Sequence, residues 1–243
     1  MTWSTADLRA LQTVSVADNE VVHVFVSIDG APGAADEALL DTGERHRAAR
    51  FVHASHRARF TLAHAAVRLF LARCLGVEPV NIRYEAGEHG KPRLAATSPP
   101  LEFNLSHAGG LCLLAAARAR AVGVDVELVR ELPDEASIAE AHFSAAEREA
   151  LRSLPPAERR PAFFRCWIRK EAVLKADGEG LGRPLDRVDV GFGGVATVSI
   201  PSPGAPREWS LVDLPAPPGY AAAGAVAASA AEPIRWRTLT LAF

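Results

Sequence analysis

The spacing of apolar residues along the chain predicts short β-strands interspersed with amphipathic helices. Residues 21–28 are rich in valine and alternate with polar residues, which is typical of a β-strand. After a start signal at Ser55, apolar residues recur at helical spacing from Phe60 to Leu71, and Gly76 supplies a stop. A strand followed by a long helix is therefore expected near the start of the chain.

Two capping boxes mark further helix starts. Asp41 with Glu44, and Ser144 with Glu147, each place an acidic residue three positions after a side chain that can cap a helix. A longer helix is expected after the prolines at 155–156. It runs from about Ala162 to Ala176 and ends in a glycine-rich stretch that contains Gly178, Gly180 and Gly182.

Short runs of β-branched and aromatic residues predict the remaining strands. They cover residues 81–85, 101–105, 111–117, 122–128, 209–214, 220–228 and 234–241, with residues 106–110 connecting the second to the third. Polar Arg118 and Arg120 break the apolar pattern near the midpoint, so we expect an N-terminal lobe at 1–119 and a C-terminal lobe at 120–243. Each half combines helices with strands that can pair antiparallel, which indicates an α+β fold.

Composition and charge exclude several classes of protein. Hydrophobic residues make up 49% of the 243-residue chain, which is enough for a buried core. A net charge of −2, with dispersed Lys and Arg, argues against a nucleic-acid binder that relies on phosphate neutralisation. The N-terminus lacks an apolar signal-peptide core, and the apolar run at 220–231 is too short to span a bilayer. We therefore expect a cytoplasmic protein that binds neither nucleic acid nor membrane.

The three cysteines, Cys74, Cys112 and Cys166, lie far apart, each in an apolar stretch. No CxxC spacing occurs, and an odd number does not suit a disulfide framework. We expect buried thiols in a reducing compartment.

The strand at 122–128 carries the first candidate chemistry. Residues two apart in a strand face the same way, so Asp125 and Glu127 point together from the face opposite the valines. Two neighbouring carboxylates repel unless a cation lies between them. The ordinary alternative is a solvated face of an antiparallel strand.

The predicted helix at 162–176 carries the second candidate. Trp167, Glu171 and Lys175 fall four residues apart on one stripe, with Lys170 beside them. A routine ion pair between Glu171 and Lys175, with Trp167 in the core, would explain the same pattern.

The third candidate is the stretch Asn104-Leu105-Ser106-His107 before a glycine-rich turn. Adjacent residues on an extended chain point apart, and no GxSxG elbow is present, so a hydrolase triad is rejected. The serine hydroxyl and the histidine suit phosphate contact. A loop serine beside a surface histidine is the alternative.

Four motifs follow one another along the chain: Gly90-Lys91-Pro92, Asn104-Leu105-Ser106-His107, Gly123-Val124-Asp125-Val126-Glu127 and Trp167-x-x-Lys170-Glu171-Ala172-x-x-Lys175. Together they resemble the Sfp-type 4′-phosphopantetheinyl transferases, in the subgroup whose helix reads Trp-x-x-Lys-Glu-Ala. The resemblance implies two pseudo-symmetric lobes, each a small antiparallel sheet packed with a long helix, with coenzyme A between them. It implies an enzyme that moves the phosphopantetheine arm of coenzyme A to a serine of an apo acyl or peptidyl carrier protein and releases 3′,5′-ADP.

The resemblance also implies a metal site and a catalytic pair. Asp125, Glu127 and Glu171 would hold a Mg²⁺ ion, which favours octahedral oxygen ligands. Glu171 and Lys175 would be catalytic, the carboxylate taking the serine proton and the ammonium contacting the pyrophosphate. Lys170 would assist Lys175.

Further residues would bind the rest of coenzyme A by the same resemblance. His107 and the nearby Ser106 would meet the 3′-phosphate, Lys91 and Pro92 would line the adenine–ribose site, and Arg59 would add a phosphate contact. 

Arg47 is a second candidate for the contact expected of Arg59, and Glu44 occupies a position that is basic in the family. Because both lobes lie in one chain, we expect a monomer. Two other hypotheses are a Mg²⁺-dependent nucleotide pyrophosphatase and a non-catalytic partner that binds carrier proteins. The carrier type is left open among those of fatty-acid, polyketide and nonribosomal-peptide synthesis.

Overall fold

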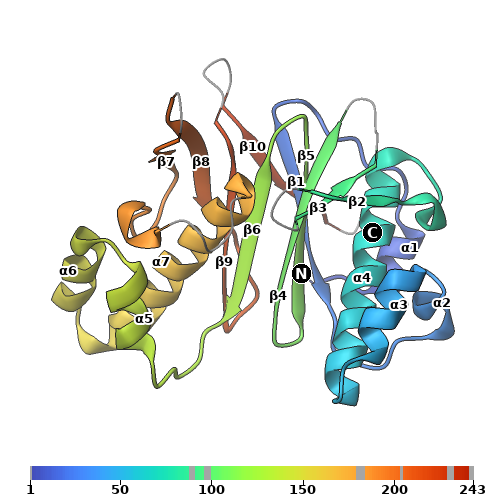
Figure 1. Ribbon diagram of the computed structural model, residues 1–243, viewed down its shortest axis with the longest axis horizontal. Coiled ribbons are helices and arrows are strands. Elements are labelled where there is room, and N and C mark those ends of the chain that lie inside the picture. The colour runs from blue at the N-terminus through green and yellow to red at the C-terminus, as the bar shows by residue number, and fades with distance from the viewer. Residues whose placement is uncertain are drawn as a thin grey trace.

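The computed structural model describes residues 2–87, 91–95, 100–178, 184–202, 205–228 and 233–240. Two four-stranded sheets pack against each other, and each is covered on its outer face by one long helix (Figure 1). The predicted α+β fold, with small, mostly antiparallel sheets and long helices, is confirmed. Gly90, Gly180 and Gly182 of the sequence motifs lie outside the described residues.

The first half of the chain contains most of one sheet and its helix, α4 (Ala54–Leu75). The sheet has the order β10-β1-β5-β4, in which all neighbours run antiparallel except β1 and β10. Its other elements are α1 (Thr5–Ala10), β1 (Glu20–Ser27), α2 (Ala34–Glu37), α3 (Thr42–Ala49), η1 (Pro79–Asn81), the small hairpin β2 (Tyr84–Ala86) and β3 (Pro92–Leu94), β4 (Leu101–Ala108) and β5 (Leu111–Arg118).

The second half contains the other sheet, with the order β6-β9-β8-β7, and its helix α7 (Pro156–Asp177). This sheet is antiparallel throughout. Besides α7, this half of the chain contains β6 (Val122–Leu128), α5 (Glu135–His142), α6 (Ala145–Ser153), η4 (Leu185–Arg187), β7 (Ala196–Ile200), β8 (Arg207–Asp213), β9 (Tyr220–Ala227) and β10 (Arg235–Thr238).

The strand β10 joins the sheet of the opposite half. Residues 235–238 pair in parallel with β1, from Glu20 with Arg235 to His23 with Thr238. The C-terminal residues expected to close the second lobe therefore complete the first sheet, while the division at 119/120 stays a prediction. Trp236 of β10 also packs against Gly224 of β9, where an added Cβ would lie 2.2 Å from its ring. The strand thus ties the two sheets together.

Three apolar clusters account for the layers. Alternate residues of β1 and β5 face α4, while the others, including Phe25 and Leu113, face the second sheet. There they meet Val122, Val124 and Val126 of β6. The predicted valine face of β6 therefore packs between the sheets, and its acidic face turns towards α7. Figure 1 shows this central contact flanked by α4 and α7.

The predicted capping boxes are both present. The Asp41 side chain accepts from Glu44 N and the Ser144 side chain from Glu147 N, and each acid reaches back to its capping residue. The long helix α4, however, begins after His53 without a side-chain cap, one residue before the predicted signal at Ser55.

Three predicted boundaries were wrong. The helix α7 begins at Pro156, because proline is tolerated at the first position of a helix, and it continues through Pro161 inside the helix. Residues 79–81 form a 3₁₀ turn, so only Tyr84 to Ala86 are extended. The strand β4 continues to Ala108, which places Ser106 and His107 in a strand instead of a loop, and β7 was not predicted.

Among the described residues, no helix is both long enough and apolar enough to cross a bilayer. The predicted disulfide-free state of the cysteines fits the structure, in which all three thiols are free and buried.

Candidate active site

A close contact between β6 and α7 brings the candidate residues together. A Cβ added to Gly123 would lie 2.2 Å from both Ala172 O and Ala176 N, so the strand backbone touches the helix backbone directly. The glycine therefore permits an approach that any side chain would prevent. Asp125, on the same face of β6, consequently lies against the last turns of α7.

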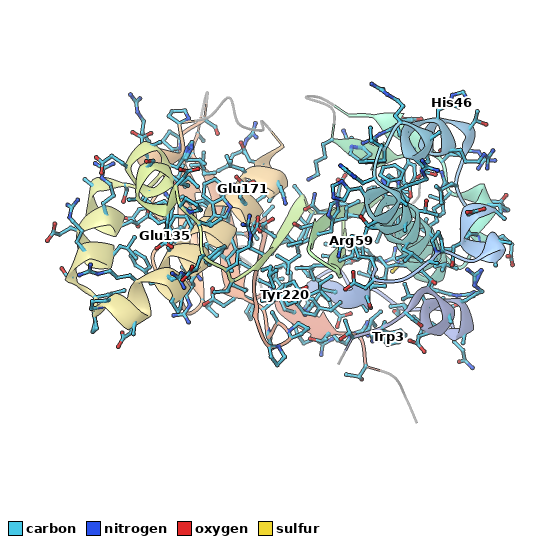
Figure 2. The ribbon with its side chains drawn as sticks, turned by 90° about the horizontal axis from the view of Figure 1, so that it is seen from below. Trp3, His46, Arg59, Glu135, Glu171 and Tyr220 are labelled. Atoms are coloured by element: carbon cyan, nitrogen blue, oxygen red, sulfur yellow. The ribbon has the colours of Figure 1, made fainter. Side chains whose placement is uncertain are left out.

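A cavity of about 470 Å³ opens at this contact. Its walls come from both halves of the chain: β4 on one side, and β6, α5, α7 and the start of η4 on the other. The lining residues are Ser106, His107, Asp125, Glu127, His142, Trp167, Glu171, Lys175 and Leu185. Six of the predicted site residues thus share one cavity. Figure 2 shows Glu171 on α7 and Arg59 on α4, the helices of opposite halves.

Asp125 lies at the centre of a short hydrogen-bond network. Its Oδ1 accepts from Lys175 Nζ at 2.6 Å and from Ser106 Oγ at 2.7 Å, and the same ammonium lies 3.0 Å from Ser106 Oγ. The Asp125 side chain is 4% exposed, and its Oδ2 has no hydrogen-bond partner. A buried carboxylate oxygen without a partner is unfavourable, so this position suits a bound cation.

The cavity disfavours the charged form of the other two acids, Glu127 and Glu171. Burial, and then the negative charge of Asp125, raises the pKa of Glu127 to about 7. The same two causes raise the pKa of Glu171, while Lys175 lowers the pKa of both acids. The cavity therefore contains more negative charge than its own cations balance.

These residues fit a divalent cation in chemistry, although they do not form a closed cage. Within the part of the chain that is described, no three His, Cys, Asp or Glu side chains converge closely enough to hold a metal ion. Mutual repulsion and the ammonium on Asp125 oppose such convergence. Three carboxylates in one cavity, one with an unpartnered buried oxygen, nevertheless provide the hard oxygen donors that Mg²⁺ prefers.

Cationic groups gather at the β4 side of the cavity. Adjacent Ser106 and His107 point apart, as predicted, the serine buried and the histidine exposed. The pKa of His107 is lowered, first by loss of hydration and then by the charges of Lys175, His64 and Arg59. This surrounding positive charge favours an anion. Arg59 is paired with exposed Asp29 at 2.9 Å.

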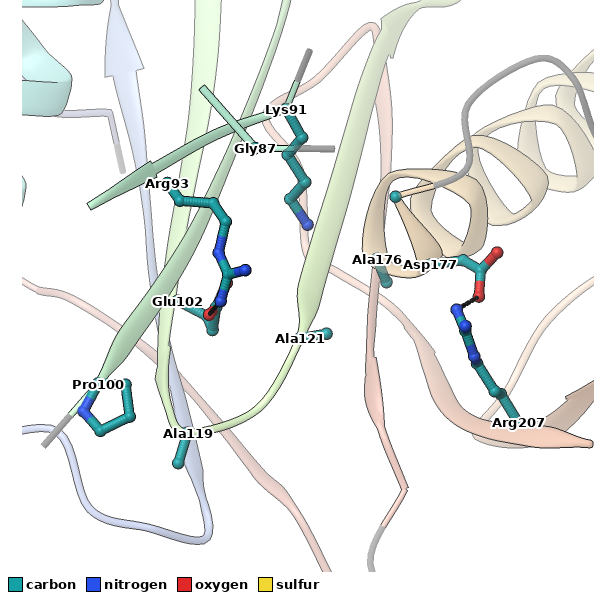
Figure 3. A pocket seen from close by; sticks show the side chains of 11 residues that line it. Gly87, Lys91, Arg93, Pro100, Glu102, Ala119, Ala121, Ala176, Asp177 and Arg207 are labelled. Atoms are coloured by element: carbon teal, nitrogen blue, oxygen red, sulfur yellow. Dashed lines mark hydrogen bonds and ion pairs between the residues drawn. The ribbon is translucent and has the colours of Figure 1, made fainter. Parts of the chain in front are cut away.

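Lys91 lies at the far end of the contact between the halves. Its Nζ donates to Val122 O at 3.1 Å and to Lys175 O at 2.7 Å, and burial lowers its pKa. Lys91 also lines a second cavity of about 490 Å³, in which Arg93 pairs with Glu102 (Figure 3). Pro92 is exposed at the start of β3. The predicted roles of Lys91 and Pro92 in coenzyme A binding stay predictions.

Lys170 is placed differently from its prediction. Its side chain is fully buried and pairs with Glu147 at 2.7 Å, and its amine also donates to Leu185 O and Val188 O. A buried amine with all its donors engaged cannot contact coenzyme A, so the predicted contact is wrong. The capping-box acid and the loop at 184–188 together bury this side of α7.

Arg47 and Glu44 of α3 both contact side chains of α4, and the role of Arg47 in phosphate binding stays a prediction. Arg47 lies over the ring of Phe60, with 5.4 Å between the guanidinium carbon and the ring centroid. Glu44 is buried and binds Arg68 at 2.8 Å and His64 Nδ1 at 2.9 Å. The acid at this position therefore organises a buried network against the middle of α4.

Two lining residues were not predicted from the sequence. His142 ends α5, and its ring meets Trp167 edge-on with 5.6 Å between centroids, while Leu185 begins η4. Neither belongs to a recognisable motif. They reach the cavity only because α5 and η4 fold back onto α7, which no local pattern indicates.

Comparison with known proteins gives consistent matches over both halves. A profile of the 4′-phosphopantetheinyl transferase superfamily matches residues 121–227, and one described as 4′-phosphopantetheinyl transferase, N-terminal, matches residues 34–119. The chain is 37% identical to 4′-phosphopantetheinyl transferase HetI of Nostoc sp. over 201 residues, which are 82% of this chain and 83% of HetI. It is 29% identical to 4′-phosphopantetheinyl transferase Sfp of Bacillus subtilis over 183 residues, 75% of this chain and 80% of Sfp.

Proposed function

This chain belongs to the 4′-phosphopantetheinyl transferase superfamily, and we propose that it moves the phosphopantetheine group of coenzyme A to a serine of an apo acyl or peptidyl carrier protein. The reaction would require Mg²⁺ and release 3′,5′-ADP. The observation that carries this proposal is the shared cavity in which the acids of β6 and α7 meet Lys175, Ser106 and His107.

Asp125, Glu127 and Glu171 are the proposed Mg²⁺ ligands. The unpartnered oxygen of Asp125 and the raised pKa values of the two glutamates support this assignment, because burial and the neighbouring charge of Asp125 both disfavour carboxylates that a bound cation would stabilise. A bound Mg²⁺ ion supplies charge neutralisation to pyrophosphate oxygens.

The phosphates of coenzyme A would lie between the two halves. Lys175 would contact the pyrophosphate from α7, and His107 with Ser106 would meet the 3′-phosphate from β4. Arg59 would add a contact after leaving Asp29, which is an exposed and therefore weakly held partner. Lys91 would line the adenine–ribose site, where its amine already joins β6 to α7.

The chemical step would be an in-line displacement at the phosphorus that carries pantetheine. The serine oxygen forms the new phosphoester bond while the phosphoanhydride bond breaks, and 3′,5′-ADP leaves with the bond electrons. Glu171 would accept the hydroxyl proton, directly or through water. Lys175 and His107 would stabilise charge on the leaving phosphates.

We also propose the two-lobe division at residues 119/120, with both lobes of a single chain forming the site. Ser106 and His107 come from one side of that division, and the three acids and Lys175 come from the other. A monomer would then contain a complete active site.

The test is incubation of the protein with coenzyme A, Mg²⁺ and a panel of apo carrier proteins of fatty-acid, polyketide and peptide type. Intact mass spectrometry should show one phosphopantetheine added to at least one carrier, and EDTA should abolish the addition. Release of 3′,5′-ADP without any carrier would instead indicate a pyrophosphatase. Binding of carriers without modification would indicate a non-catalytic partner.

A further inference from the structure

Lys175 forms an ion pair with the proposed metal ligand Asp125 in this structure. The ammonium lies 2.6 Å from Asp125 Oδ1 and 3.0 Å from Ser106 Oγ. Asp125 is almost entirely buried, whereas the Lys175 side chain is 30% exposed. The aspartate is therefore fixed within the protein, whereas the lysine side chain is accessible from the cavity.

The charges in the cavity explain why the lysine sits there. Asp125, Glu127 and Glu171 bring three carboxyl groups into one space, and Lys175 is the cation that directly contacts one of them. Without a metal ion, the ammonium is the group that offsets the charge of Asp125. Its single positive charge supplies part of the charge that a divalent cation would supply at this position.

A metal ion arriving alone meets an obstacle in this arrangement. It would have to bind Asp125 beside an ammonium already held at hydrogen-bond distance, and like charges repel. A pyrophosphate arriving with the metal changes this, because its oxygens offer Lys175 a new anionic partner. The flexible four-carbon side chain of a lysine allows such an exchange.

We propose that Lys175 is a displaceable counter-ion, which holds Asp125 until coenzyme A arrives and thereby makes metal and coenzyme A bind cooperatively. This inference rests on the proposed function. Coenzyme A draws the ammonium to its pyrophosphate, which removes a competing positive charge from beside Asp125 and its unpartnered Oδ2. By linkage, metal must then raise the affinity for coenzyme A by the same factor.

The experiment measures Mn²⁺ binding by electron paramagnetic resonance, with and without coenzyme A and without a carrier, so that no turnover occurs. Mn²⁺ replaces Mg²⁺ as a visible ion with the same preference for oxygen ligands. The variants are Lys175→Met and Lys175→Gln, which remove the charge but keep a long side chain. Arg130→Met is the matched control, since exposed Arg130 acts on Glu127 through its charge. Circular dichroism confirms that each variant is folded.

In the unsubstituted protein, coenzyme A should tighten Mn²⁺ binding at least tenfold. Both Lys175 variants should bind Mn²⁺ alone at least tenfold more tightly than the unsubstituted protein, and the further tightening by coenzyme A should be at least threefold smaller than in the unsubstituted protein. Arg130→Met should change the affinity for Mn²⁺ alone less than threefold and keep the cooperativity.

The inference is overturned if the Lys175 variants bind Mn²⁺ alone no better than the unsubstituted protein, or if they keep full cooperativity with coenzyme A. An equal gain in affinity for Mn²⁺ alone in Arg130→Met would also overturn it, because removing any nearby positive charge would then explain the tighter binding. If the unsubstituted protein binds no Mn²⁺ even with coenzyme A, the metal assignment in the proposed function fails as well. The two failures are therefore distinguishable.

Discussion

Replacing Gly123 by alanine should separate α7 from β6 and disable the site without unfolding the chain. The new Cβ would lie 2.2 Å from Ala172 O and from Ala176 N, and 2.8 Å from the carbonyl carbon of Lys175. These neighbours are backbone atoms of one helix, so no side chain can rotate away. The helix as a whole must move.

The size of the movement follows from the contact distances. Ordinary van der Waals contact begins near 3.4 Å, so the helix must retreat by about 1 Å. The 2.6 Å bond from Lys175 Nζ to Asp125 Oδ1 would then lengthen beyond hydrogen-bond range. A displacement of about 1 Å costs roughly 100-fold in rate, and overpacking costs about 1–3 kcal/mol of unfolding free energy.

The assay is kcat/KM for carrier modification with coenzyme A and Mg²⁺, together with urea unfolding. Gly224→Ala is the matched control: its Cβ would lie 2.2 Å from the ring of Trp236, which is equally tight but belongs to β10 and not to α7. We expect similar losses of stability in the two variants, but a roughly 100-fold loss of kcat/KM only in Gly123→Ala.

Near-normal kcat/KM for a folded Gly123→Ala protein would refute this reasoning, because the close approach of strand and helix would then not position the catalytic groups. An equal activity loss in Gly224→Ala would refute it too, since overpacking anywhere in the sheet would produce the effect.

The remaining predictions concern the charged groups. Asp125→Asn and Glu171→Gln should each abolish carrier modification, measured by intact mass, while circular dichroism stays unchanged; a near-normal rate in either would remove that residue from the metal site. Glu127→Gln should stabilise the metal-free protein at pH 8 but not at pH 5. The pKa of Glu127 is raised to about 7, so the contribution of its carboxyl group to the free energy of unfolding is full below pH 4.5. That contribution is lost as the pH rises through 7, by about 3 kcal/mol at most. Thermal melts in EDTA in which the unsubstituted protein and Glu127→Gln show no pH-dependent difference would contradict this. Lys170→Met should cost about 3–5 kcal/mol in urea unfolding, because it leaves the buried Glu147 carboxylate without its cation. Adding Glu147→Gln should recover part of that loss, and a strictly additive double variant would argue against the pair.

The sequence predicted correctly those local features that depend on residues only a few positions apart, such as the two capping boxes and the two faces of β6. The capping boxes at Asp41 and Ser144 form as predicted, because a cap depends only on side chains three positions apart. The alternation along β6 correctly separated its valines from Asp125, because strand geometry has a period of two. The order of the four motifs indicated the family, and the comparisons confirm it.

Tertiary structure decided which of the candidate residues meet. Lys175 shares its helix stripe with Glu171, but no local pattern tells that Lys170, beside that stripe, is buried away from the cavity. Lys170 pairs with Glu147, the acid of the capping box that starts α6, and both side chains are buried. The pairing of β10 with β1 likewise joins residues more than 200 positions apart.

The sequence by itself thus determined the family, most of the strands and the two capped helix starts, and it supplied the acids proposed to bind a cation. Only the folded chain decided that Lys170 is structural, that His142 and Leu185 line the cavity, and that Lys175 holds Asp125. The physical reason is that backbone conformation responds to neighbours in the chain, whereas burial and charge pairing depend on which surfaces pack together. Those surfaces belong to segments that are distant in sequence.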